Sequence, residues 1–316
     1  MNTFFLDRLN SEPHALAFAG QSTPWPVALA DQSANPALDE ALHTHAAAAQ
    51  ALLYPVSAEL LATTGRPVDL FGFEPNPARL GAAAAASASV PGIALTQLGA
   101  LLDAAALGYN PAQAKPVVVL GHSQGVLAVH MVQAICEAGS IDAAAAKIDE
   151  ILAIATLIGV AGTRQARQLG LAARHGEATP MLSVKDITRA QVDALIERVD
   201  GARGPIAVAV TNSATHYVLS GYPEDLAAFG VEVAKEHKRQ AKLREEKVRG
   251  GRVFGPTLEY LDVTLPFHSP LMADAVSQAV AWAEACGINA DHARELAAEV
   301  LLNHVDWAAR VRALMK

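Results

Sequence analysis

The chain has 316 residues, of which 52% are hydrophobic and 18% charged, and its formal net charge is −8. This composition supports a large hydrophobic core and excludes an intrinsically disordered chain. The acidic balance, without a dense basic patch, disfavours nucleic acids and anionic membranes as partners.

The two cysteines, Cys136 and Cys286, have neither the spacing of metal ligands nor the number that a disulfide framework needs. We therefore expect no metal site and a reducing compartment. Residues 1–8 lack a basic segment followed by a long apolar stretch, and no membrane-spanning segment is evident. These features predict a cytoplasmic protein without membrane association.

A first strand is predicted at Ala15–Gln21, where it runs into a Gly-Gln turn. Helices are expected from about Val27 to Leu61 and from Ile93 to Leu107, because their apolar residues recur at helical spacing. Between them, Val68–Pro75 is predicted to be a loop that Gly and Pro interrupt.

The sequence Gly121-His122-Ser123-Gln124-Gly125 follows the apolar run Val117–Leu120 and precedes a second apolar run. The first run is typical of a buried strand and the second of a helix. A serine on a sharp turn between strand and helix is a nucleophile elbow, which predicts that Ser123 is a catalytic nucleophile. The alternative is an ordinary glycine-rich turn in a parallel sheet.

The elements after the elbow begin with a long apolar helix, Asp142 to Leu169. The next predicted elements form the order β-α-β-β-α-β, which is that of a ferredoxin-like unit: Met181–Val184, a helix capped by Thr188 that runs to Val199, Ile206–Val210, Tyr217–Ser220, a helix from Pro223 to about Lys238, and Leu258–Val263. We predict a subdomain at 179–264 inserted into a larger α/β domain formed by 1–178 and 265–316.

A serine needs a base to act as a nucleophile near neutral pH. Among the eleven histidines, His268 lies on a loop directly after a predicted strand, and Pro266 and Pro270 stiffen that loop. We predict that His268 is the base, against the alternative of a loop histidine bonded to the backbone. No carboxylate is evident as a third member, and a backbone carbonyl can orient the imidazole instead.

The charged stretch Lys238–Arg252 ends in two glycines flanked by arginines. A solvated helix and turn is one interpretation. The other is a docking surface for an acidic partner or for phosphate groups.

Several motifs together resemble the acyl/malonyl-CoA:acyl-carrier-protein transacylases: Phe18-Ala19-Gly20-Gln21, Gly121–Gly125, Leu219-Ser220-Gly221 and Pro266–Pro270. That resemblance implies an α/β-hydrolase-like core with a parallel sheet and a ferredoxin-like subdomain. A narrower similarity is to the N-terminal acetyltransferase domain of bacterial (mycobacterial and corynebacterial) type I fatty acid synthase. It is carried by Gly121–Val129, Asn212-Ser213, Lys247–Gly251 and Val305-Asp306-Trp307.

The resemblance implies transfer of an acyl group from coenzyme A to the phosphopantetheine thiol of an acyl carrier protein. Ser123 would carry the acyl group as an ester, and His268 would move the protons. The backbone N–H groups of Gln21 and Gln124 would form the oxyanion hole. Coenzyme A is a substrate in this scheme, and no cofactor is expected.

The resemblance also implies substrate-binding roles for Gln97, Ile158 and Asn212, although Gln97 has the alternative of a helix-surface residue. Malonyl-using relatives carry an arginine that pairs with the malonyl carboxylate, and Ile158 stands at the matching position. Because an isoleucine cannot pair with a carboxylate, we predict a short neutral acyl group, acetyl first.

The family's C-terminal Gly-Pro-Gly stretch, whose neighbouring carbonyl orients the histidine, is absent from this sequence. We therefore expect a fragment of a multidomain synthase that assembles as a homo-oligomer and whose partners include a carrier domain. Three alternative functions stay open. They are a malonyl or other acyl transferase of the same family, a serine thioesterase or hydrolase, and a non-enzymatic structural domain.

Overall fold

The computed structural model describes residues 8–21, 24–70, 85–171, 178–245 and 254–314. The chain divides into two compact units. The first unit comprises 1–165 and 275–300, and the second comprises 166–274 and 301–316. Each unit is described by itself.

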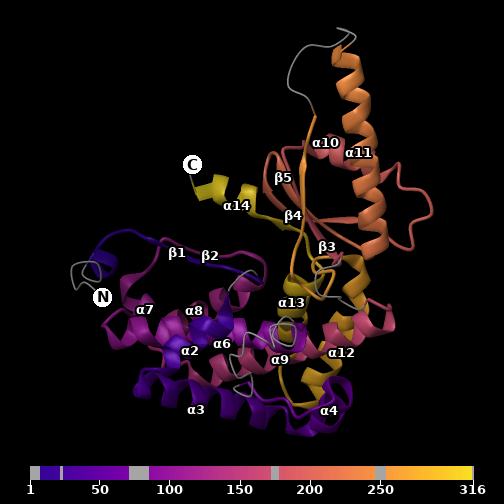
Figure 1. Ribbon diagram of the computed structural model, residues 1–316. Helices are drawn as coiled ribbons and strands as arrows, with labels where there is room; N and C mark the ends of the chain where they lie inside the picture. Colours follow the sequence, from indigo (N-terminus) through magenta and orange to yellow (C-terminus); the bar gives the residue numbers. More distant parts are fainter. Residues whose placement is uncertain (1–7, 22–23, 71–84, 172–177, 246–253, 315–316) are drawn as a thin grey trace. The chain divides into compact units, whose positions relative to one another are not determined.

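The first unit is mainly helical (Figure 1). The helices that lie wholly or mainly in it are α2 (Trp25–Ser33), α3 (Pro36–Leu52), α4 (Ser57–Thr64), α6 (Ala86–Ala106), α7 (Pro111–Ala114), α8 (Val126–Ala138), α9 (Ala145–Gln168), α12 (Ala273–Ala285) and α13 (Ala290–Leu301). A short 3-10 helix, η1 (Tyr54–Val56), joins α3 to α4.

Helix α6 forms the centre of this unit, where it packs against α2, α3 and α8. It is buried almost continuously from Ala86 to Leu101. A β-carbon at Gly92 would lie 2.5 Å from the Trp25 ring, so glycine permits the close approach of α2. The helix is long and apolar enough to span a membrane, but 72% of its most apolar window is buried in the protein. A core helix meets the same criterion.

Two short strands, β1 (Ala15–Phe18) and β2 (Val118–Gly121), form a parallel pair in the first unit. Ala15 is opposite Val118, and Phe18 is opposite Gly121. Helix α8 packs against both strands. This pairing places the chain that follows β1 beside the turn that follows β2.

The second unit contains a five-stranded sheet with the strand order β6-β3-β5-β4-β7. Its elements are β3 (Met181–Lys185), α10 (Arg189–Ile196), β4 (Ala207–Ser213), β5 (His216–Ser220), α11 (Pro223–Glu245), β6 (Thr257–Tyr260), η4 (Pro270–Met272), β7 (Val305–Asp306) and α14 (Trp307–Leu314). The pairs β6–β3, β3–β5 and β5–β4 are antiparallel, whereas β4 and β7 are parallel.

Alternate residues of β3 and β5 give this sheet its apolar face. Leu182 and Val184 of β3, with Tyr217 and Leu219 of β5, form a core with residues of α10 and α11. The two-residue period of a strand explains why these side chains share one face. Phe229 of α11 is fully buried in the same cluster.

The order strand, helix, strand, strand, helix, strand from β3 to β6 is the order that the sequence predicts. The capping box of Thr188 and Gln191 at the start of α10 is present. Helix α11 continues to Glu245, seven residues beyond the predicted end at Lys238.

The compact units differ from the predicted division into 1–178 with 265–316 and 179–264. Residues 301–316 belong to the second unit because β7 pairs with β4, and α14 packs on β4. Whether 179–264 is an inserted subdomain stays a prediction.

Candidate functional site

The turn after β2 has the backbone geometry of a nucleophile elbow. Strand β2 leads into a 3-10 turn, η3 (Ser123–Gly125), and then into α8. Ser123 has φ +55°, a left-handed conformation that costs a non-glycine residue free energy and is concentrated at functional sites. The predicted strand–turn–helix order is confirmed, whereas the catalytic role of Ser123 stays a prediction.

The two glycines of the motif are required by close backbone contacts. A β-carbon at Gly121 would lie 2.3 Å from the Val126 nitrogen, and one at Gly125 would lie 2.3 Å from the Phe18 oxygen. Both distances are far below van der Waals contact. Glycine at these positions therefore lets the elbow pack against α8 and β1.

The segment Ala19-Gly20-Gln21 lies against the elbow. A β-carbon at Gly20 would come within 2.8 Å of the His122 oxygen and 3.0 Å of the Ser123 β-carbon. The Gln21 side-chain Nε2 donates a hydrogen bond to Oε1 of Gln124. The residues predicted for the oxyanion hole are therefore neighbours in the first unit.

Gln97 of α6 also holds this segment. Its Nε2 donates to the Ala19 carbonyl at 2.7 Å, and only 7% of the residue is exposed. Its Oε1 is buried and has no hydrogen-bond partner within the described part of the chain. The alternative of a helix-surface glutamine is wrong, because Gln97 points to the protein interior beside the elbow.

Ile158 is fully buried in α9. The next residue, Gly159, approaches the start of α6 so closely that a β-carbon would lie 2.4 Å from the Ala86 oxygen. Arg164, six residues further along α9, donates to Gln278 Oε1 at 2.9 Å and lies over the Trp282 ring. Its guanidinium is thus engaged by α12.

In the second unit, His268 lies on the loop between β6 and η4 and is 2% exposed. Its Nδ1 lies 2.8 Å from the main-chain carbonyl of Asn303, and its φ is +56°. The neighbouring Ser269 N–H donates to the Leu301 carbonyl at 3.2 Å. The imidazole is therefore fixed in orientation by a backbone acceptor.

The Asn303 carbonyl is of the kind that the sequence analysis expected to orient the imidazole, a main-chain oxygen in place of a carboxylate. The resemblance implies that the orienting carbonyl neighbours a Gly-Pro-Gly stretch that this sequence lacks, but the structure supplies one from the turn after α13. No sequence signal marks Asn303, because a main-chain oxygen is available at every residue.

Asn212 lies half-buried on β4, beside a register irregularity between Thr211 and Ser213. The Thr211 hydroxyl and His304 Nε2 are 3.0 Å apart, and burial lowers the pKa of His304. Asn212 and His268 belong to the second unit, whereas Gln21, Gln97, Ser123, Gln124 and Ile158 belong to the first.

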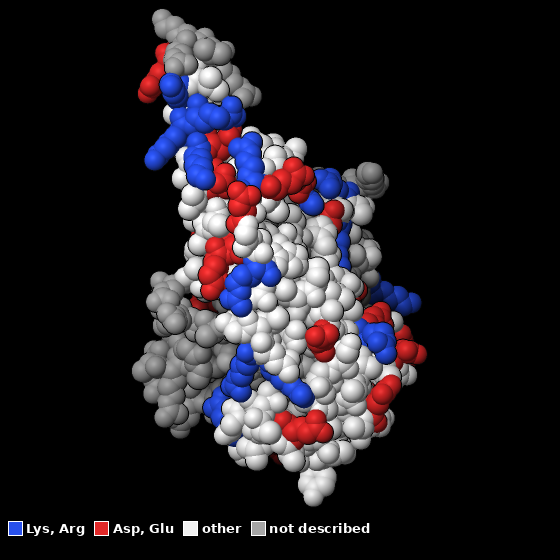
Figure 2. Space-filling model, turned by 90° about the vertical axis from the view of Figure 1, so that its right-hand side faces the viewer, with Lys and Arg blue, Asp and Glu red and all other residues white. Residues whose placement is uncertain are grey.

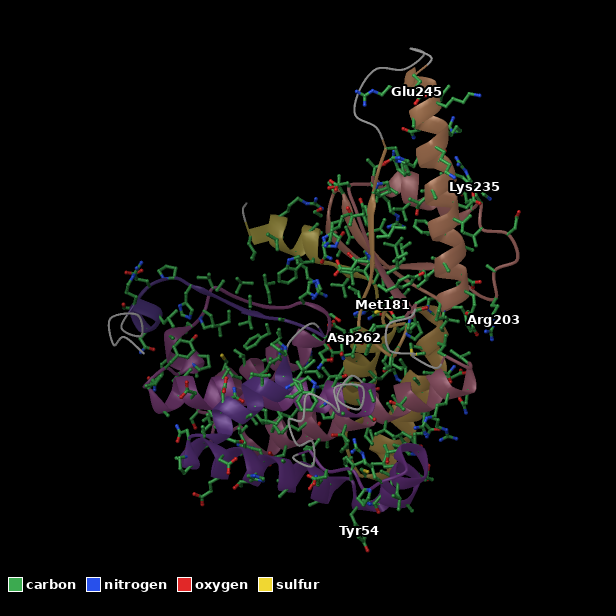
Figure 3. All side chains as sticks on the ribbon, viewed as in Figure 1. Tyr54, Met181, Arg203, Lys235, Glu245 and Asp262 are labelled. Carbon is green, nitrogen blue, oxygen red and sulfur yellow. The ribbon has the colours of Figure 1, made fainter. Side chains whose placement is uncertain are left out.

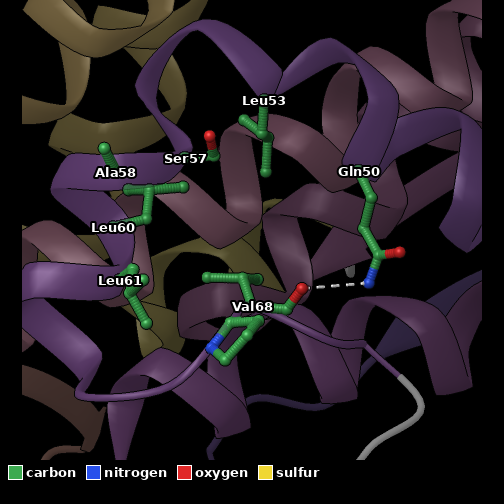
Figure 4. Close-up of a pocket in the computed structure, with 8 residues that line it drawn as sticks. Gln50, Leu53, Ser57, Ala58, Leu60, Leu61 and Val68 are labelled. Atoms are coloured by element: carbon green, nitrogen blue, oxygen red, sulfur yellow. Dashed lines mark hydrogen bonds between the residues drawn. The ribbon is translucent and has the colours of Figure 1, made fainter.

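A separate apolar pocket of about 430 Å³ opens in the first unit, between α3, α4 and the segment after α4 (Figure 4). Gln50 Nε2 donates to the Val68 carbonyl across it at 3.2 Å. The Ser57 hydroxyl donates to the Tyr54 carbonyl, and the Tyr54 side chain extends away from the protein (Figure 3). This pocket contains none of the predicted site residues.

The C-terminal half of α11 carries a concentration of Lys and Arg (Figure 2). Its exposed basic residues are Lys235, Lys238, Arg239, Lys242 and Arg244. Figure 3 shows Lys235 and Glu245 along this helix. Of the stretch Lys238–Arg252, residues 238–245 are helical and 246–252 lie outside the described residues. Its docking role stays a prediction.

Glu236 of α11 is the acceptor of several hydrogen bonds from neighbouring side chains. Its carboxylate accepts hydrogen bonds from Arg239 (2.6 and 2.9 Å), from Gln240 (2.7 Å) and from Arg198 (3.1 Å). These contacts lower the pKa of Glu236 to about 2, and the hydrogen bonds from Arg239 contribute most.

Within the described ranges no group of three or more His, Cys, Asp or Glu side chains could hold a metal ion.

Comparison with known proteins finds similarity to fatty acid synthases. A family model described as the fatty acid synthase central AT domain matches residues 180–260. The fatty acid synthase beta subunit hexB of Dothistroma septosporum is 27% identical over 179 residues, which are 52% of this chain and 9% of that subunit. The chain spans 5–10% of the length of the fungal synthase relatives that it matches.

Solved structures show the fold. The malonyl CoA-acyl carrier protein transacylase of Coxiella burnetii has a TM-score of 0.58 and 17% identity, with 96% of this chain and 84% of that chain covered. The malonyl-transacylase PlMCAT, solved with the acyl-carrier protein AntF, has a TM-score of 0.56 and 18% identity, covering 96% and 85%. The chain therefore has the α/β fold of the malonyl-CoA:acyl-carrier-protein transacylases, and part of it is similar to fatty acid synthase.

Proposed function

We propose that the chain is an acyltransferase that moves a short acyl group from coenzyme A to an acyl carrier protein through an ester on Ser123. The observation that carries this proposal is the elbow itself. Ser123 is held in a left-handed conformation between two glycines that no larger residue can replace without a shift, with Gly20 and Gln21 alongside. Such a turn is costly to maintain without a use for the serine hydroxyl.

The reaction proceeds in two halves. Ser123 Oγ attacks the thioester carbonyl while His268 takes the serine proton, and the backbone N–H groups of Gln21 and Gln124 stabilise the oxyanion. Coenzyme A leaves as the thiol after receiving that proton. The carrier's phosphopantetheine thiol then gives its proton to His268 and attacks the acyl-serine. The bond from the acyl carbon to Ser123 Oγ breaks, and His268 returns the proton to that oxygen.

His268 suits this role because its Nδ1 is engaged by the Asn303 carbonyl. A bond from Nδ1–H to a carbonyl selects the tautomer whose Nε2 carries no proton, which is the form that a base needs. No acidic residue is needed to orient the ring.

Acetyl is the acyl group that we favour. Ile158 lies in a fully buried apolar stretch of α9, and Arg164 is engaged by Gln278 and Trp282. An unpaired malonyl carboxylate buried there would be strongly unfavourable. Malonyl is the second candidate, because the solved structures that share the fold include malonyl transacylases. Gln97 and Asn212 are proposed to contact the bound substrate.

The proposed partners are coenzyme A thioesters, an acyl carrier domain and the other domains of a multidomain, homo-oligomeric synthase in the cytoplasm. Similarity to fatty acid synthase subunits supports this setting, as does the carrier protein solved with PlMCAT. The narrower likeness to the bacterial type I synthase domain stays within this proposal. No cofactor is required, since the first half-reaction uses a thioester and the serine hydroxyl, and the second uses the serine ester and a thiol.

The test follows the acyl group with carrier thiol present and absent. Radiolabelled acetyl-CoA or malonyl-CoA is mixed with the chain, and transfer to holo-carrier is compared with release of free acid. Transfer that rises with carrier concentration while hydrolysis stays low supports the proposal. Release of free acid at a rate that carrier does not alter would identify a thioesterase instead.

A further inference from the structure

Resting on the proposed function, we propose that the side chain of Gln124 is a positioning group, which holds the Gln21 segment in place against the elbow. The proposed chemistry uses only the backbone N–H of this residue. The elbow motif likewise leaves the side chain after the serine undefined. The structure gives that side chain partners of its own.

Gln124 is fully buried, and both ends of its amide are engaged. Its Oε1 accepts a hydrogen bond from Gln21 Nε2, and its Nε2 donates to the Val90 carbonyl of α6 at 3.0 Å. A buried amide is costly unless both its donor and acceptor groups are bonded. One side chain therefore connects three segments: the turn after β1, the elbow and α6.

The Gln21 segment needs such a connection. Gly20 has no side chain to pack, and the close approach of its backbone to His122 and Ser123 leaves no room for one. The segment is held from α6 by Gln97, which donates to the Ala19 carbonyl at 2.7 Å, and from the elbow by Gln124. These two glutamines fix the residues on either side of Gly20.

A fixed segment matters because an oxyanion hole works by preorganisation. Donors that are already in place stabilise charge without the cost of reorganising during the reaction. Loss of one oxyanion donor slows acyl transfer by about 10²–10³-fold. A donor that is present but loosely held should cost part of that, about 10- to 100-fold.

An apolar residue at position 124 would fill the same space but would not hold the Gln21 segment by a hydrogen bond. Leucine at position 124 would leave Gln21 Nε2 without its acceptor. The variants are therefore Gln124→Leu and Gln21→Met, each of which keeps the backbone N–H and removes the side-chain bond. Gln133→Leu is the matched control, since Gln133 lies exposed on α8 and bonds only to Glu137 among the contacts described for it.

Two readouts are measured for the wild type and each variant. The first is the single-turnover acylation rate of Ser123 against acetyl-CoA or malonyl-CoA concentration, which separates the maximal rate from the half-saturating concentration. The second is the rate at which a fluorophosphonate labels Ser123, a reaction that needs an oxyanion hole but no thioester. Thermal unfolding of each variant is recorded in parallel.

We expect a 10- to 100-fold lower maximal acylation rate in both single variants, with an unchanged half-saturating concentration. The fluorophosphonate rate should fall in proportion. The double variant should be no slower than the slower single variant, because the two side chains share one bond. Gln133→Leu should match the wild type in both reactions.

Different results separate the two proposals. Wild-type rates in Gln124→Leu and Gln21→Met, or a double variant whose losses multiply, would overturn the positioning role. The fluorophosphonate rate could fall as expected in the variants although no acyl-CoA acylates the wild type. That result would support the positioning role of Gln124 and overturn the proposed acyltransferase function. A wild-type Ser123 that neither reagent modifies would overturn both. Because Gln21 is only half-buried, Gln21→Met keeps the test valid if Gln124→Leu unfolds.

Discussion

The imidazole of His268 is held by a main-chain carbonyl: its Nδ1 lies 2.8 Å from the oxygen of Asn303. The two residues are 35 positions apart in the sequence, and the contact depends on how the chain returns after α13. A hydrogen bond from the ring to a backbone oxygen sets both the tautomer and the ring plane. It also survives any substitution that spares the backbone, unlike a bond to a carboxylate side chain.

Replacement of the proposed base should remove transfer without unfolding the protein. We expect His268→Ala to lower the acylation rate of Ser123 by at least about 10³-fold, because the serine then lacks a proton acceptor. Single-turnover acylation of Ser123 and circular dichroism measure the two properties. His43→Ala, on the exposed side of α3, serves as the control. Acylation of His268→Ala within a few-fold of the wild type would exclude this residue as the base.

Substitution of the last elbow glycine should destabilise the protein. Gly125→Ala places a β-carbon 2.3 Å from the Phe18 oxygen, so β1 must shift. We expect a loss of at least about 2 kcal/mol in the free energy of unfolding, measured with urea, and loss of acylation. Gly230→Ala is the control, because the new β-carbon in α11 would meet Leu258 at 3.6 Å. That control should be neutral or slightly stabilising. Equal stabilities of the two variants would contradict the packing described for the elbow.

Stability should fall in acid partly through Glu236. Its pKa in the folded chain is about 2, below the ordinary value of 4.5, so its contribution is complete above pH 4.5 and is lost as the pH falls towards 2. We expect Glu236→Gln to cost about 1–2 kcal/mol in the free energy of unfolding at pH 7. The cost is no larger because Arg198 and Arg239 are half exposed and water screens their charges. It should shrink as the pH approaches 2, where the wild-type carboxylate becomes protonated. Urea unfolding between pH 7 and pH 2.5 measures the difference. A difference that does not change with pH would contradict the shifted pKa.

The acyl preference should respond to residue 158. Ile158→Arg places a cation in a fully buried apolar stretch, so the free chain should lose stability. A malonyl carboxylate would pair with that cation, and we expect the ratio of malonyl to acetyl loading to rise at least about tenfold. Competition between the two thioesters, read by mass spectrometry, measures the ratio, with Ile158→Met as the uncharged control. An unchanged ratio in a folded Ile158→Arg would remove residue 158 from the acyl site.

Local signals predicted much of the fold. The elbow was predictable because the glycines at 121 and 125 follow a β-branched run that forms a strand. The predicted burial of that strand was wrong, because residues 118–120 are half-buried and Val117 is exposed. The α10 cap was predictable because Thr188 and Gln191 have the spacing of a capping box. Helix α11 runs past Lys238 without burying further residues, so hydrophobic periodicity could not predict its end.

Contacts between distant segments were not predictable from the sequence. The pairing of β7 with β4 joins residues about 95 positions apart, and a two-residue strand leaves no pattern of its own. The hydrogen bonds from Gln21 to Gln124 and from Gln124 to the Val90 carbonyl use glutamine side chains that nothing in the sequence distinguishes from other glutamines. The family resemblance pointed to Gln97, whose burial only the structure reveals.

Intact-protein mass spectrometry after mixing the chain with acetyl-CoA or malonyl-CoA tests the central claim most directly. We predict a covalent acetyl adduct that Ser123→Ala abolishes and that free carrier thiol removes, with a smaller malonyl adduct. A malonyl adduct of equal or greater yield would contradict the acetyl assignment. The absence of any adduct on Ser123, in a protein whose folded state circular dichroism verifies, would contradict the acyl-serine mechanism itself.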